Sequence, residues 1–104
     1  MADNQLIDLK VALIKSHWPQ CNTLAKELFE IGGNDAKEAL IEALRAKRHH
    51  IRTAAIENLS KFNDSSLAIQ IRPFLNDPSY ETRMAAKAAI HELTGEAVLT
   101  GRDE

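Results

Sequence analysis

Apolar side chains recur at helical spacing in six segments of the chain, and short polar turns separate these segments. In the middle of the chain, Ile51, Ala55, Leu59 and Phe62 fall on one stripe of a helix. Nowhere do apolar and polar residues alternate as they do along a half-buried strand. The pattern predicts an all-α fold. We expect six helices, near residues 5–16, 20–31, 35–46, 49–62, 65–75 and 78–93.

The residues between these segments supply signals for helix starts and ends. Asp35, with Glu38 three positions later, has the spacing of a capping box, and Asp77 before Pro78 is typical of an N-cap followed by proline in the first turn. Gly95 follows the last segment, where a left-handed C-cap favours glycine. We therefore expect Asp35 and Asp77 to cap the third and sixth helices.

The helical pattern also repeats along the chain. Arg83 lies 31 positions after Arg52, and Ile90 lies 31 positions after Leu59, which itself lies 31 positions after Leu28. A period in this range is typical of stacked helix pairs, because a single pair cannot bury its apolar stripe alone. We expect one domain over residues 1–95, with repeats near 5–33, 34–63 and 64–95, and a tail over 96–104.

The third repeat, "IRPFLNDPSYETRMAAKAAIHEL", resembles the HEAT repeat, in particular the short bacterial HEAT-like variety. Pro73 stands where that family bends its first helix, and Asp77 and Arg83 match its ladder of aspartates and arginines. Cys21 replaces the arginine in the first repeat and Ala46 replaces the aspartate in the second, so the expected ladder is incomplete. The resemblance implies an α-solenoid of three HEAT-like helix pairs that presents its second helices on a concave face.

Composition and charge say more about the compartment of the protein than about its function. The 13 basic and 15 acidic residues give a net charge of −2, which provides no global attraction for nucleic acid or an anionic membrane. The single cysteine, Cys21, excludes an internal disulfide and favours a reducing compartment. The opening "MADNQLIDLK" lacks the basic segment of a secretory signal, and no apolar run is long enough to span a bilayer. We expect a cytoplasmic protein with no membrane partner, for which nucleic acid is the weaker alternative.

No motif indicates catalysis or a bound cofactor. The chain lacks a glycine-rich phosphate loop, and His91-Glu92 lacks the second histidine of the zinc-protease motif. The di-iron deoxyhypusine hydroxylases, which have HEAT-like repeats, place His-Glu just after the repeat arginine, where this chain has Thr53 and Met84 as the first residue of each pair. We expect no enzymatic activity and no cofactor. An accessory or maturation factor related to HEAT-like lyases is an alternative that would require a bound metal or cofactor.

The segment "RAKRHHIR", residues 45–52, contains four basic residues and two histidines and no acid. One interpretation is a binding site for an acidic partner or polyanion. The other is a solvated turn whose cations lie favourably near a helix C-terminus. The residues that would supply charge to a partner are Arg48, His49, His50 and Arg52. His17 and Cys21 of the preceding repeat could approach these histidines, but we expect no metal site.

Three ring-bearing residues share one position of the 31-residue repeat. Trp18, His49 and Tyr80 should therefore lie side by side along one edge of a stack. Rings of this kind are common in binding surfaces because they bury a large area with few rotamers. Met84 falls near Tyr80 on the outward row of the last helix. The alternative is that the rings pack on one another and on the next turn to close gaps between repeats.

These observations favour a non-enzymatic protein–protein interaction module or scaffold that binds a partner on its concave face and the adjoining turn edge. The candidate contact residues are Trp18, Arg48, His49, His50, Arg52, Tyr80 and Met84. The expected structural ladder consists of Asp77, Arg83 and Pro73. The first helix has more apolar residues than one buried stripe needs, so it either caps the stack or pairs with a second copy of the chain.

Overall fold

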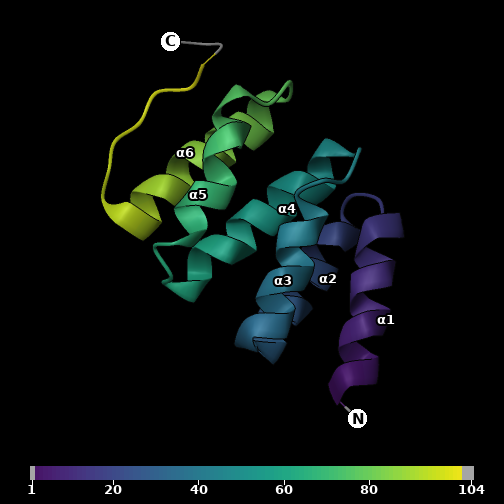
Figure 1. Ribbon diagram of the computed structural model, residues 1–104. Coiled ribbons are helices and arrows are strands. Elements are labelled where there is room, and N and C mark those ends of the chain that lie inside the picture. The colour runs from purple at the N-terminus through teal and green to yellow at the C-terminus, as the bar shows by residue number, and fades with distance from the viewer. Residues whose placement is uncertain (1, 102–104) are drawn as a thin grey trace.

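The computed structural model describes residues 2–101, and this part of the chain contains six α-helices, two short 3-10 helices and no strand (Figure 1). The helices are α1 (Ala2–Lys15), α2 (Gln20–Ile31), α3 (Gly33–Ala43), α4 (His49–Leu59), η1 (Ser60–Phe62), α5 (Leu67–Ile71), η2 (Arg72–Asn76) and α6 (Tyr80–Thr94). The predicted all-α fold is confirmed. Among the described residues, no helix is both long enough and apolar enough to cross a membrane.

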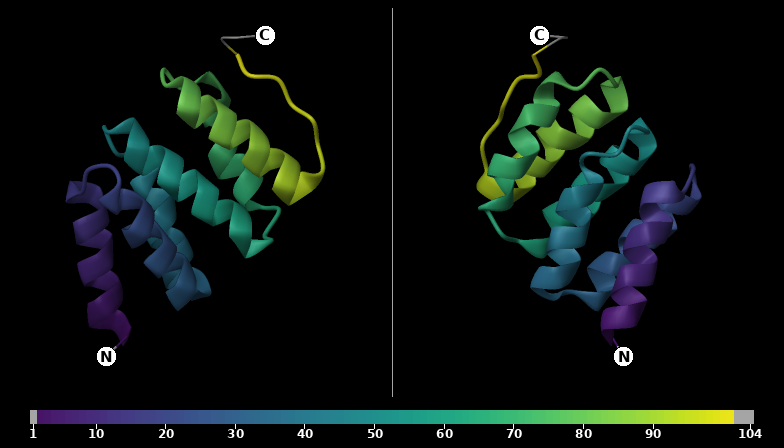
Figure 2. Two further views of the ribbon diagram at one scale, coloured as in Figure 1. Left: turned by 180° about the vertical axis from the view of Figure 1, so that it is seen from behind. Right: turned by 45° about the vertical axis from the view of Figure 1, so that its right-hand side comes forward.

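Helices α2, α4 and α6 lie side by side, with α4 in contact with both of the others. Helix α1 contacts α3, and α5 packs against α6 (Figure 2). The molecule is elongated, with principal extents of 45 × 26 × 17 Å. Helix α4 is central, because it contacts α2, α3 and α6.

The buried positions follow the 31-residue spacing. Leu28, Leu59 and Ile90 are each 0% exposed, and they belong to one continuous apolar core. Burying a leucine or isoleucine side chain stabilises a fold by about 1.5–3 kcal/mol relative to leaving it in water. Small residues such as Ala55 on α4 and Ala86 on α6 are both 0% exposed and belong to the core, and the two helices contact each other.

Both predicted aspartate caps are wrong. Helix α3 begins at Gly33 without a side-chain cap, because the chain already turns at Gly32, and Asp35 lies within its first turn. Helix α6 begins at Tyr80, and its N-cap is Ser79, whose side chain accepts a hydrogen bond from the Thr82 N–H. The Asp77 Oδ1 accepts a hydrogen bond from the Ser79 N–H at 2.9 Å, so Asp77 supports the turn before α6 but does not itself cap the helix.

The fifth predicted helix, near residues 65–75, is divided at Pro73. The α-helical part α5 ends at Ile71, and the chain continues as the 3-10 helix η2, with Pro73 close to its start. Proline has no N–H to donate and its ring clashes with the preceding turn of an α-helix. The tighter 3-10 geometry lets the helical path continue past the proline, so Pro73 changes the helix type without ending the segment.

The tail returns to the domain. After α6 the chain runs back beside α5 and α6 (Figure 1), and the Gly101 N–H donates a hydrogen bond of 2.9 Å to the Leu75 carbonyl. Val98 packs against the core, Thr100 is 2% exposed, and Arg72 forms an ion pair with Glu96. Residues 96–101 therefore pack on the third repeat, while residues 102–104 of the predicted tail lie outside the described part of the chain.

Candidate functional site

The amino ends of α4 and α6 lie next to each other and form a turn edge that joins the second and third repeats. His49 is the first residue of α4, and its Nδ1 lies 3.2 Å from the Ser79 Oγ at the start of α6. One turn further, the Thr53 and Thr82 hydroxyls lie 2.9 Å apart, which is hydrogen-bonding distance. Polar contacts thus hold the two helix starts in a defined register.

The rings at this edge follow an order that differs from the predicted one. His49 and His50 have ring centroids 4.0 Å apart, and Trp18 lies 5.9 Å from His50. The predicted neighbour of Trp18 was His49, but the His49 ring turns toward Ser79 and leaves His50 beside the indole. Tyr80 lies instead against the Arg83 guanidinium, 5.7 Å from the ring centroid. Consecutive residues at a helix start therefore point to different neighbours.

Arg52, predicted as a partner-binding residue, is turned into the joint between repeats. Its Nε and Nη2 donate to the two carboxylate oxygens of Asp77, each at 2.9 Å, and its Nη1 donates to the Ala46 and Lys47 carbonyls at 2.9 and 2.8 Å. The side chains of Arg52 and Asp77 are 14% and 4% exposed. A forked, charge-assisted pair of this kind is strong and geometrically specific. These contacts make Arg52 a structural residue that links two turns.

Arg83 makes the same backbone contacts one repeat later. Its Nη1 donates to the Asp77 and Pro78 carbonyls at 2.7 and 3.1 Å, and the residue is 7% exposed. These acceptors lie six and five positions before Arg83, as Ala46 and Lys47 do before Arg52. The equivalence seen in the sequence therefore extends to individual hydrogen bonds.

The electrostatics of Asp77 reflect this joint. Burial alone would raise its pKa, but hydrogen bonds from Arg52 and from the Ser79 N–H outweigh that effect and hold the pKa below the ordinary value of 3.8. The charge of His49 lowers it further. Asp77 is therefore an anion over the neutral pH range, and its charge is matched by Arg52.

The remaining cations of the basic turn face outward. Arg45, Lys47 and Arg48 are exposed, and the Arg48 Nη1 donates weakly, at 3.5 Å, to the Ser16 carbonyl of the preceding turn. Since Arg52 is paired with Asp77, the outward positive charge is smaller than the sequence segment suggests.

Met84 belongs to a different surface. It lines a shallow, mainly apolar groove of about 350 Å³ between α6 and the returning tail. The other lining residues are Lys87, Ala88, His91, Ala97 and Val98. Tyr80 is not among them, although it lies one turn before Met84 on α6; that both residues contact a partner stays a prediction.

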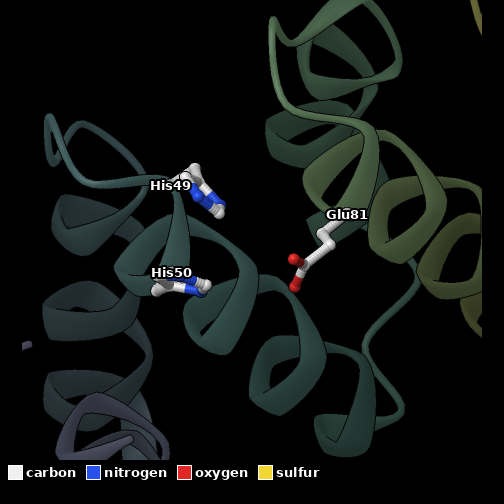
Figure 3. Close-up of side chains that lie close together, drawn as sticks. All are labelled: His49, His50 and Glu81. Atoms are coloured by element: carbon white, nitrogen blue, oxygen red, sulfur yellow. The ribbon is translucent and has the colours of Figure 1, made fainter. Parts of the chain in front are cut away.

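Glu81 is a residue of the turn edge that the sequence reasoning missed. His49, His50 and Glu81 each bring one ligand-type atom within 4.8 Å of the others (Figure 3). The signal was present in the repeat, because Glu81 lies 31 positions after His50 and so occupies the same place in the next helix pair. Figure 3 shows the Glu81 carboxylate directed from α6 toward the two rings at the start of α4.

The thiol considered for a metal site lies elsewhere. Cys21 is 0% exposed, burial raises its pKa above 9.0, and its Sγ lies 3.9 Å from the Asn22 Oδ1. Neither Cys21 nor His17 belongs to the metal-capable group found among the described residues. The turn edge instead offers two imidazoles, a carboxylate and an indole.

Comparison with known proteins assigns no family, because no protein-family model, curated protein or solved structure matches the chain.

Proposed function

We propose that the chain is a non-enzymatic protein–protein interaction module built as a HEAT-like α-solenoid. Support for this architecture comes from the 31-residue spacing, which recurs in the burial of Leu28, Leu59 and Ile90 and in the hydrogen bonds of Arg52 and Arg83. Contacts between consecutive helices and between α2, α4 and α6 agree with stacked helix pairs. Interaction is the activity that such an extended surface supports best.

The observation that carries the proposal is an exposed apolar stripe on α1. Ile7, Val11 and Ile14 are 55%, 46% and 42% exposed, and their spacing places them on one face of the helix. The opposite face of α1 supplies Leu9 and Leu13 to the core. A helix that is apolar on two faces at the end of a helical stack is typical of an interface.

The partner we propose for this face is a second copy of the chain, with the two α1 helices antiparallel. Asp8 and Lys15 lie on the same flank of the stripe, two turns apart, and no hydrogen bond or ion pair involves either of them within the described residues. A twofold axis near Val11 would place Asp8 of each copy opposite Lys15 of the other. The charges beside the stripe are thus complementary in an antiparallel pair.

Sedimentation equilibrium over a concentration series tests the apolar part of this interface. We expect a reversible dimer for the wild type and a monomer for Val11→Glu, because the new carboxylate would be buried against the partner helix. Ile69→Glu is the matched control, since Ile69 is an isolated apolar side chain on α5 that is 72% exposed. A wild-type chain that stays monomeric at all concentrations would contradict the self-pairing.

A charge swap tests the antiparallel arrangement. Asp8→Lys should weaken the dimer by placing two lysines opposite each other, and adding Lys15→Asp should restore it by recreating the pair with reversed sign. A parallel pair would bring each position opposite itself, so the double change would give no recovery. Circular dichroism of each variant separates loss of pairing from loss of helix.

The turn edge is the expected contact surface for a different protein. Trp18 and Tyr80 are 61% and 60% exposed, which leaves two large rings available to a partner. The polyanion-binding alternative is less well supported, because Arg52 is paired with Asp77 and only exposed surface cations remain in the basic turn.

A further inference from the structure

We propose that His49, His50 and Glu81 form a binding site for a divalent transition-metal ion of the zinc class. The imidazole and carboxylate atoms of the three residues lie within 4.8 Å of one another and come from the amino ends of α4 and α6 (Figure 3). The site rests on this geometry alone and is independent of the proposed pairing through α1.

The donor set fits a borderline ion. Two imidazoles and one carboxylate are common ligands of Zn²⁺ and of Ni²⁺ or Cu²⁺, whereas Ca²⁺ and Mg²⁺ prefer oxygen donors only. Zinc–ligand bonds of about 2.0–2.2 Å place the donor atoms of a tetrahedron about 3.3 Å apart. Glu81 is exposed, so rotation of its side chain can bring the carboxylate the remaining distance. Three protein ligands leave the fourth position open to water or to another ligand.

Neighbouring groups hold the histidines in a suitable orientation. The His49 Nδ1 lies 3.2 Å from the Ser79 Oγ, and Ser79 is itself fixed as the N-cap of α6. When Nδ1–H donates to this hydroxyl, the lone pair of Nε2 remains available to the metal, which is the usual role of a group behind a metal-binding histidine. Trp18 packs at 5.9 Å from the His50 ring and limits the rotation of that ring.

The charges around the site permit a bound cation, although the dipoles of α4 and α6 disfavour a cation at their amino ends. The Arg52 guanidinium is paired with Asp77, the Arg48 Nη1 is directed to the Ser16 carbonyl, and Glu81 supplies a negative charge at the site. Glu57 lies close enough to both Lys61 and Glu81 for its charge to interact with theirs. Direct coordination by three ligands outweighs the dipoles, but the open site should bind less tightly than a closed four-ligand site.

A bound ion would join the second repeat to the third at their edge. It would bind the folded chain, in which His50 and Glu81 are close, better than the unfolded chain, and would therefore raise the thermal midpoint with the logarithm of its concentration once that exceeds the Kd. The ion would act as a clamp across the same joint that Arg52 and Asp77 form on the buried side.

Titration of tag-free, chelator-stripped protein with ZnCl₂ in a calorimeter tests the site. We expect one ion per chain with a Kd tighter than about 100 µM. The variant Glu81→Gln should weaken binding about tenfold or more while leaving the exposed α6 surface folded, and His50→Gln should do the same. His91→Gln, at the far end of α6, is the matched control and should bind like the wild type.

The single tryptophan gives a second readout. Cu²⁺ and Ni²⁺ quench nearby indole fluorescence, so titration with either ion should quench Trp18 in the wild type and in His17→Gln but not in His50→Gln. Sub-stoichiometric or absent Zn²⁺ binding, or equal Zn²⁺ affinity in Glu81→Gln and the wild type, would overturn the site. Repeating the sedimentation series in EDTA separates this result from self-pairing through α1.

Discussion

Arg52 and Asp77 form the least exposed ion pair among the described residues. The guanidinium satisfies both carboxylate oxygens of Asp77 and two carbonyls of its own turn, so a single side chain closes one turn and links it to the next. Removal of one partner from such a buried pair leaves the other charge buried without compensation, and this strongly destabilises the fold.

We predict that Arg52→Met lowers the free energy of unfolding by about 3 kcal/mol, because Asp77 then remains buried without its cation. Urea denaturation followed by circular dichroism measures the change. Arg45→Met is the control on the same basic turn: Arg45 is exposed, and we expect its replacement to change stability by less than about 0.5 kcal/mol. Equal effects of the two substitutions would show that the buried pair has no special role.

The lowered pKa values of two carboxylates predict that the protein loses stability in acid. Hydrogen bonds from Ser66 and Lys37 lower the pKa of Asp64 from 3.8 to about 2, and the pKa of Asp77 is also lowered. The unfolded chain then takes up protons before the folded chain, so this stability is present above pH 3.8 and is lost as the pH falls through the folded pKa. Thermal midpoints between pH 5 and 2 should fall steeply for the wild type and less steeply for Asp64→Asn. Parallel curves would contradict the assignment.

At the scale of elements, α4 and α6 contact each other and each carries small buried side chains. Ala54 and Ala55 on α4, and Ala86 and Ala89 on α6, are at most 3% exposed. Helical period predicts buried rows of this kind, and the 31-residue spacing relates Ala55 to Ala86, whereas Ala89 corresponds to Asn58. The same reasoning could not predict the helix starts, because Ser79 takes the N-cap position of α6 and the turn at Gly32 begins α3 two residues before Asp35.

We predict that Ala86→Leu destabilises the fold by about 1–3 kcal/mol, because the larger side chain must separate α4 from α6 or distort them. Ala88→Leu, two positions along the same helix and exposed, is the control and should leave stability nearly unchanged. Chemical denaturation of both variants measures the difference. A tolerated leucine at position 86 would indicate that the contact has room that the structure does not show.

At the scale of the whole molecule, the residues of the turn edge come from all three repeats: Trp18 from the first, His49 and His50 from the second and Glu81 from the third. The repeat spacing predicts that these segments approach one another, but it does not determine which side chain faces which neighbour. That choice follows from local contacts, such as the one between His49 and Ser79, which no periodicity contains. The sequence therefore predicts which segments approach one another, and only the structure shows which side chains are in contact.

The central place of α4 also determines how the molecule should open. This helix contacts α2, α3 and α6, whereas α1 contacts only its neighbours at one end of the stack. Local unfolding begins where few contacts must be broken, so amide hydrogens of α1 should exchange with solvent through fraying of the end helix. Those of Ala54, Ala55 and Ile56 in α4 should exchange last, and only when the whole domain unfolds.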